Sequence, residues 1–174
     1  MFILFSVITI LFILIASAAY AGFRAAPWVP TWGKDFDRVV RLADLKSGEI
    51  VYELGAGEGR LLLQFAHTPA AEITGFEISL VPYAIAWLRV RRLRPRVSVR
   101  FKDFFKIDFS QANVIFCFLT PPAMRKLQLK FAAECKPGTR IISYAFSIPG
   151  WTPDVMDKPK PNAMAIYRYI IGRA

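Results

Sequence analysis

Glu53-Leu54-Gly55-Ala56-Gly57-Glu58-Gly59-Arg60 directly follows the apolar run Ile50-Val51-Tyr52, and these residues are the most informative part of the sequence. Its glycines alternate, which suits a tight loop because glycine adopts positive φ and lets a backbone approach a ligand closely. A helix-like segment over residues 61–66 comes next. The stretch therefore predicts a strand, a glycine-rich loop and a helix, which is the unit that opens many nucleotide-binding sheets.

The spacing and charge of this loop favour S-adenosylmethionine (SAM) over a dinucleotide. A dinucleotide fingerprint has its third glycine three residues after the second, and here that position is Arg60. Glu53 and Glu58 flank the turn and would repel a pyrophosphate at the helix N-terminus, because like charges at close range cost energy. SAM has an adenosine, no phosphate and a cationic methionine tail. We therefore expect Glu53, Gly55, Gly57 and Gly59 to bind SAM.

Residues 2–22 carry no charge and are almost wholly apolar. As a helix they are long enough to cross about 30 Å of hydrocarbon. No basic residue precedes this segment, whereas Arg24, Lys34, Arg38 and Arg41 follow it, so the positive-inside rule predicts a single-pass anchor with the domain in the cytoplasm. A cleaved signal peptide is the alternative, with small residues at 16–18 or 19–21 as the cleavage site. We expect an anchor over residues 1–22, a juxtamembrane connector over 23–33 and one domain over 34–174.

The net charge of +10 lies outside the apolar segment, and eight basic residues between Arg89 and Lys106 supply much of it. Beside a membrane anchor, contact with an anionic lipid surface is the first interpretation of this cluster, and a solvated helix end is the second. Nucleic acid is an unlikely partner because no nucleic-acid-binding module accompanies the charge. Cys117 and Cys135 lack metal or redox spacing, so no metal site is expected.

Apolar runs alternate with helical periodicity along the domain, which predicts an α/β fold: a Rossmann-like, doubly wound and mostly parallel sheet. The segment from Pro149 to Pro161 holds four prolines and too few apolar residues for a helix. The last two strands should therefore pair as an antiparallel C-terminal hairpin. We expect strands at 49–54, 73–78, 97–102, 113–119, 139–146 and 164–170, and helices at 34–45, 59–66, 81–93 and 123–135.

Ligands of doubly wound sheets bind beyond the C-terminal ends of the strands, which selects further site residues. Glu77 ends the second strand, 20 residues after Gly57, where a carboxylate can accept from both ribose hydroxyls. Asp103 follows the third strand and is placed to accept from the adenine amino group. Both are predicted cofactor-binding residues, with an exposed loop acid as the alternative for each.

The fourth and fifth strands should end next to the acceptor. Thr120 and Pro121 follow the fourth strand and would position the acceptor opposite the methyl group; the alternative is a plain helix start, since proline is favoured in a first turn. Phe146 and Trp151 follow the fifth strand and could hold an alkylated amine by cation–π contact.

These elements, in this order over roughly residues 34–171, resemble the class I (seven-β-strand) SAM-dependent methyltransferases. A closer resemblance is to the membrane-associated lysine methyltransferases of the ATP synthase c-subunit and the adenine nucleotide translocase. The motifs that carry it are the hydrophobic N-terminal segment, Val29-Pro30, ELGAGEGR, GFEIS, Asp103-Phe104-Phe105, the stretch 136–143 and Phe146-x-x-Pro149-x-Trp151-x-Pro153.

This resemblance implies Glu53, Gly55, Gly57 and Glu77 at the SAM site, Asp103 near the adenine, and a lysine of a membrane protein as methyl acceptor. The chain departs from the family pattern at Glu58, where an aspartate is common. Thr120 stands where amino-methylating enzymes have Asn or Asp before paired prolines.

The sequence therefore predicts a membrane-anchored SAM-dependent methyltransferase that modifies a protein lysine near the bilayer. One alternative keeps the chemistry but changes the acceptor to a lipid, a quinone or another small apolar molecule. A second alternative is a non-catalytic scaffold that binds SAM without turning it over.

Overall fold

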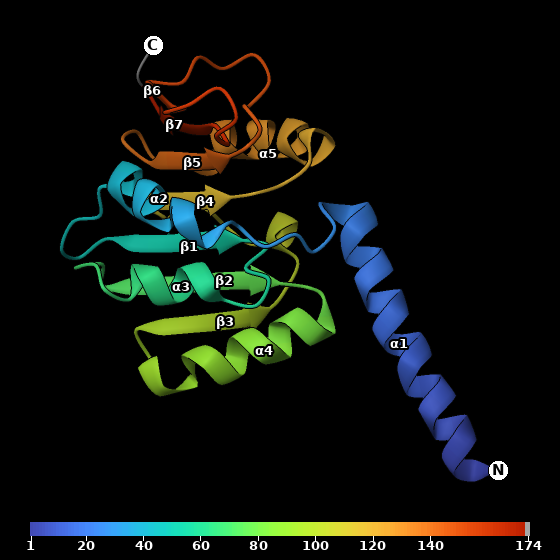
Figure 1. The fold of residues 1–174 in the computed structure, drawn as a ribbon. Coiled ribbons are helices and arrows are strands. Elements are labelled where there is room, and N and C mark those ends of the chain that lie inside the picture. Colours follow the sequence, from blue (N-terminus) through green and yellow to red (C-terminus); the bar gives the residue numbers. More distant parts are fainter. Residues whose placement is uncertain (173–174) are drawn as a thin grey trace.

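The computed structural model of the protein describes residues 1–172. Its centre is a seven-stranded sheet (Figure 1). The strands are β1 (Ile50–Leu54), β2 (Glu72–Glu77), β3 (Val97–Phe101), β4 (Val114–Cys117), β5 (Arg140–Tyr144), β6 (Val155–Asp157) and β7 (Ile166–Ile170). Their order in the sheet is β3-β2-β1-β4-β5-β7-β6, with β1 to β5 parallel and β7 antiparallel to both of its neighbours. The predicted α/β class, the parallel sheet and the antiparallel C-terminal pairing are confirmed.

Helices cover both faces of this sheet (Figure 1). One core cluster joins the sheet to α2, α3 and α4, and a second joins the opposite face to α5 and the last 3₁₀ turn. The helices are α1 (Phe2–Arg24), α2 (Phe36–Ala43), α3 (Arg60–Phe65), α4 (Leu80–Val90) and α5 (Pro121–Glu134), with 3₁₀ turns η1 (Gly33–Asp35), η2 (Arg91–Leu93) and η3 (Phe104–Lys106).

Strand β6 lies in the proline-rich segment, where the sequence predicted none. It has three residues and pairs with β7, so that Met156 lies opposite Tyr167. Because β6 is the edge strand of the sheet, Pro153 and Pro159 can flank it without removing a hydrogen bond from a central ladder. Helix α5 also begins earlier than the expected 123, because Pro121 occupies its first turn.

Helix α1 is apolar and unburied over most of its length, and it projects away from the domain (Figure 1). Its length and mean hydropathy of 2.8 would allow it to cross a membrane. Its C-terminal half contacts the domain: the Ser17 hydroxyl oxygen accepts from the backbone N–H of Leu80 at 2.9 Å, and Arg24 pairs with Asp103 at 2.9 Å. The end of the apolar helix is therefore fixed to the edge of the sheet where the ligand site was predicted.

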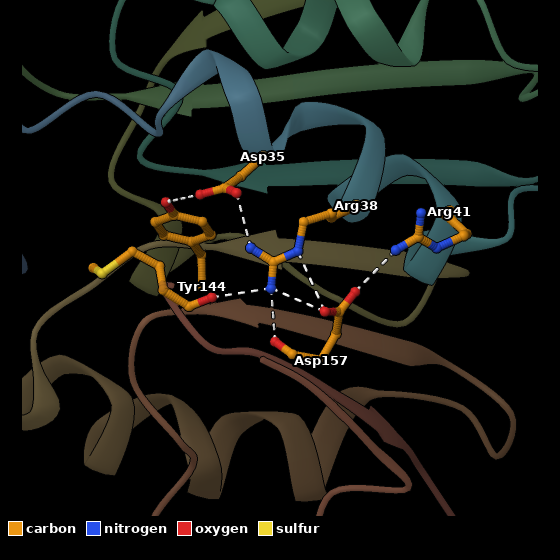
Figure 2. Close-up of polar contacts among 6 residues, drawn as sticks. Asp35, Arg38, Arg41, Tyr144 and Asp157 are labelled. Atoms are coloured by element: carbon orange, nitrogen blue, oxygen red, sulfur yellow. Dashed lines mark hydrogen bonds and ion pairs between the residues drawn. The ribbon is translucent and has the colours of Figure 1, made fainter. Parts of the chain in front are cut away.

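A buried polar cluster fixes α2 to the C-terminal strands (Figure 2). Arg38 pairs with Asp35 at 2.8 Å and with Asp157 of β6 at 3.0 Å, and Arg41 reaches the second oxygen of Asp157. The Tyr144 hydroxyl donates to Asp35 at 2.7 Å. Burial alone would raise the pKa of Asp35, but the hydrogen bonds from Tyr144 and Arg38 outweigh burial and lower it. This cluster orders the short β6, which has few apolar contacts of its own.

Candidate functional site

The glycine-rich loop lies over the C-terminal end of β2. The N–H groups of Gly55 and Ala56 both donate to the Phe76 carbonyl at 2.9 Å. Gly75 of β2 makes this approach possible, because a Cβ there would lie 2.7 Å from the Ala56 methyl carbon. Gly57 has a φ of +53°, and the Trp28 indole nitrogen lies 3.3 Å from where its Cβ would be. Gly55, Gly57 and Gly59 all have positive φ, as the sequence predicted, and their close packing against protein side chains is an additional finding.

Gly59 combines a left-handed backbone with close packing against α4. Its φ is +74°, and an added Cβ would lie 3.2 Å from the Ala86 Cα. Gly48 has a φ of +83° but no atom within 4 Å of its added Cβ.

We expect Gly48→Ala to lower the free energy of unfolding by about 1–2 kcal/mol, through left-handed strain alone. Gly59→Ala should cost about 1–3 kcal/mol more through overpacking. Denaturant unfolding of both variants measures the difference, and equal losses would refute the packing role.

A cavity of about 440 Å³ opens at this edge of the sheet. The glycine loop and the end of β2 form one side of it. The opposite side comes from α1 and the connector between α1 and η1. That side includes Leu14, Ala18, Ala21, Trp28 and Val29.

Glu53 lies in the wall of this cavity with an unpartnered carboxylate oxygen. Its side chain is only 4% exposed, and Oε2 has no hydrogen-bond partner within the described residues. Burial raises the pKa of Glu53 well above its usual range, and the charge of Glu77 raises it further. A buried carboxyl that lacks a partner is stabilised by a cation, since pairing offsets its desolvation.

Glu77 is the last residue of β2 and lies beside the loop, as the spacing of 20 residues predicted. Its Oε2 accepts from the Gly57 N–H at 2.8 Å. Its Oε1 accepts from the N–H groups of Ile78 and Ser79 at 2.9 and 2.7 Å. These three bonds fix the carboxylate between the loop and the start of α4. A role in binding ribose remains a prediction.

Glu58, which flanks the turn, has a basic partner in the structure. Arg89 of α4 lies 2.9 Å from its carboxylate and donates to its carbonyl oxygen at 2.8 Å. This ion pair reduces the negative charge that Glu58 adds at the turn. The carboxylates that face the cavity without a basic partner among residues 1–172 are those of Glu53 and Glu77.

Asp103 follows β3, but its carboxylate has two partners in the structure. Oδ2 pairs with Arg24 of α1, and Oδ1 accepts from the Phe105 N–H at 2.9 Å. The cavity wall at this position is instead Phe104. Contact between Asp103 and adenine thus remains a prediction, while its observed contact fixes the end of α1.

Thr120 and Pro121 lie at the start of α5, where the sequence allowed either an acceptor site or a helix start. The Thr120 hydroxyl donates to the Ala25 carbonyl at 2.5 Å, so it ties α5 to the end of α1. The neighbouring Leu119 lines the cavity; within residues 1–172, Thr120 and Pro121 do not. Their proposed role in acceptor positioning has no direct support from this geometry.

The two aromatic residues proposed for substrate binding lie in different surroundings. Phe146 is partly exposed and stacks on Phe118 at 6.5 Å between ring centroids, and Phe118 lines the cavity. Trp151 instead packs edge-on against Tyr169 in the second core cluster. Phe146 therefore lies next to the cavity, and Trp151 has a packing role.

The connector between α1 and η1 contributes Trp28 to the site, and the sequence alone had not decided the location of this residue. The sequence allowed Trp28 at the membrane interface or over the cofactor mouth, and the structure has it against Gly57. Phe36, at the start of α2, also lines the cavity, and the Arg60 guanidinium lies 5.5 Å from its ring centroid. The sequence feature that could have indicated a place for Trp28 at the cavity was its position, one turn beyond an apolar helix and close to proline.

These features fit SAM. The unpartnered Glu53 oxygen matches an ammonium group, because a cation would compensate its burial. The apolar walls of the cavity suit an adenosine.

Comparisons with known proteins agree with a SAM-dependent methyltransferase. The family model of the ANTKMT methyltransferase domain matches residues 53–155, more than half of the chain. A protein-lysine N-methyltransferase of Saccharolobus islandicus is 34% identical over 84% of this chain and 94% of its own length. The mouse lysine N-methyltransferase of the ATP synthase c-subunit is 32% identical over 74% of this chain, but the match spans only 52% of the mouse protein.

A solved structure of a methyltransferase has a similar fold. A Salinibacter ruber RNA methyltransferase, crystallised with S-adenosyl-L-homocysteine, superposes with a TM-score of 0.76 at 28% identity over 84% of this chain and 96% of that one. The fold, the SAM-compatible cavity and the family match together lead to one conclusion. The chain belongs to the ANTKMT methyltransferase domain family and is a class I SAM-dependent methyltransferase.

Proposed function

We propose that this enzyme methylates lysine side chains of a membrane protein and that α1 anchors it in the same membrane. The observation that carries the proposal is the position of α1: the apolar helix forms one wall of the cofactor cavity through Leu14, Ala18 and Ala21. An acceptor that enters beside this wall would come from the bilayer surface. The basic residues at and beyond the C-terminal end of α1, beginning with Arg24, favour a cytoplasmic domain.

The relatives support the acceptor class. The Saccharolobus relative is a protein-lysine N-methyltransferase. Mouse relatives act on the ATP synthase c-subunit and on the adenine nucleotide translocase, by their names.

Methyl transfer to lysine requires that the cofactor and the amine be correctly positioned and that the amine be neutral. When bound, SAM supplies an activated methyl group to an amine as the carbon–sulfur bond breaks. Glu53 would hold the cationic amino-acid end, and the loop anchored by Glu77 would fix the cofactor; positioning of this kind accounts for a large share of catalysis. A lysine near pKa 10.4 must first lose a proton. Apolar walls such as Phe118 and Leu119 favour the neutral amine because burial disfavours charge.

Radiolabelled methyl-SAM, incubated with membranes and the full chain, tests the proposal. We expect label in the protein fraction, on lysine after hydrolysis. Glu77→Gln should reduce the label at least about tenfold, because hydrogen bonds to a charged group are worth about 1.5–3 kcal/mol. Glu72→Gln on the same strand is the matched control, since the Glu72 carboxylate, 3.6 Å from Arg100, lies outside the cavity.

Other outcomes select the alternatives. Label in the lipid fraction would indicate a lipid, quinone or other small apolar acceptor, which the apolar cavity wall could also admit. SAM binding without any S-adenosylhomocysteine formation would indicate a non-catalytic scaffold. Either outcome would refute the protein-lysine proposal.

A further inference from the structure

The outer surface of α4 is nonpolar where a surface helix normally carries polar residues. Val81, Trp87 and Leu88 are exposed on it, Leu88 to 53%. Phe101, on the neighbouring edge strand β3, is half exposed and lies against Tyr83 of α4 at 5.2 Å between ring centroids. Exposed apolar groups gathered on one surface indicate an interaction site.

Basic residues surround these side chains, and the segment that carries them contains no acid. Residues 78–102 contain seven Arg and Lys and no Asp or Glu. Arg89 and Arg100 pair with glutamates, and Arg96 donates to backbone carbonyls between α3 and β2. The other four are exposed and form no ion pair within residues 1–172: Arg91, Arg92, Arg94 and Lys102.

Helix α1 brings this surface to the membrane. Ser17, whose hydroxyl accepts from the Leu80 N–H, lies seven residues before Arg24. Seven residues of α-helix rise about 10 Å. The headgroup layer of one leaflet is roughly 5–8 Å thick. If Arg24 marks the outer limit of that layer, the first turn of α4 meets α1 near the boundary between headgroups and hydrocarbon.

The α4 surface comprises Val81, Trp87, Leu88, Arg91, Arg92, Arg94, Phe101 and Lys102. We propose that the α4 surface binds the anionic face of the membrane into which α1 inserts. The proposal rests on the anchoring part of the proposed function. Apolar side chains would enter the interface while the basic residues contact lipid phosphates and carboxylates. A second attachment beside α1 would stop the domain from rotating about its connector and would hold the cavity next to the bilayer.

RNA is the other polyanion that this charge could attract. The aliphatic side chains of Val81 and Leu88 argue against it, because RNA binding relies on phosphate contacts and on aromatic stacking. The hydrogen bond between α1 and the start of α4 also favours the membrane.

A fluorescent probe on the full chain in vesicles tests the proposal. Both native cysteines are buried, and burial raises the pKa of the Cys117 and Cys135 thiols to about 12, so an introduced exposed cysteine is labelled selectively. The environment-sensitive probe NBD is attached at Leu88→Cys. The control is Leu129→Cys, a 74% exposed leucine on α5, across the sheet. In phosphatidylglycerol-containing vesicles we expect blue-shifted emission and quenching by brominated lipid at position 88, and neither at 129.

The charge requirement is tested in the same background. Reversal at Arg91→Glu, Arg92→Glu and Arg94→Glu should abolish most of the shift, and pure phosphatidylcholine should give a weaker one. Similar emission at positions 88 and 129 overturns the proposal, as does a shift unaffected by charge reversal. Displacement of the shift by a short RNA would overturn it in favour of a nucleic-acid surface. Flotation with the vesicles reports α1 insertion separately: flotation without a shift refutes only the α4 contact, and failure to float refutes anchoring as well.

Discussion

Glu53→Gln should weaken SAM binding by roughly 100-fold. Removing one partner of a buried charge pair costs about 2–5 kcal/mol, and each 1.4 kcal/mol is tenfold in affinity. The variant keeps the size of the side chain, so the cavity should retain its shape. Isothermal titration calorimetry measures the affinity. Glu58→Gln is the control, because Glu58 lies in the same loop and its carboxylate already pairs with Arg89 of α4. The affinity of this variant for SAM should change less than about threefold.

The pH dependence of this binding follows from the raised pKa of Glu53. Below that pKa the ligand-free protein holds a proton on Glu53, and a cationic ligand must expel it. Affinity should therefore rise with pH, by up to about tenfold per unit, and level off above the folded-state pKa. A flat profile in wild type, or an unchanged profile in Glu53→Gln, would contradict an ion pair with the ligand.

The unfolding of the ligand-free protein should show the opposite trend. A carboxyl whose pKa is raised by folding stabilises the fold below its unfolded value of 4.5, and this contribution is lost as pH rises through the folded-state pKa. The free energy of unfolding should fall by up to about 1.4 kcal/mol per pH unit across that window. Glu53→Gln should lack this component.

Arg38→Ala is expected to lower the free energy of unfolding by about 3–5 kcal/mol, because it leaves the buried carboxylate of Asp35 without its ion-pair partner. The Arg38 side chain is 12% exposed, and it neutralises both Asp35 and Asp157. Urea unfolding at neutral pH measures the loss.

Arg41→Ala provides the matched comparison. Arg41 pairs with the same Asp157, but its side chain is 66% exposed, so the loss should stay below about 1 kcal/mol. Similar effects for the two variants would show that burial of the cluster does not set its contribution. Because Asp157 belongs to β6, a loss of protection from hydrogen exchange in β6 and β7 should accompany Arg38→Ala.

The predictable parts of the molecule depend on local or regular patterns. The strand–loop–helix unit follows from glycine spacing and apolar periodicity. The position of Glu77 beside Gly57 follows because successive parallel strands bring their C-terminal ends to one edge of the sheet.

The unpredicted parts depend on contacts between distant segments. Arg24 pairs with Asp103 across 79 residues, and Thr120 reaches Ala25 across 95. Neither pairing has a periodic signature. The three residues of β6 form a strand only because β7 and the Arg38 cluster hold them, so local propensity could not reveal it.

The wall that α1 contributes to the cavity has a practical consequence. Hydrophobic leaders are commonly removed to obtain soluble protein, and here that step would take away Leu14, Ala18 and Ala21 together with the partner of Asp103. We infer that the soluble remainder would bind its cofactor in a half-open groove. Assays of this methyltransferase should therefore use the chain with α1 retained, in detergent or lipid, because α1 forms part of the cavity wall.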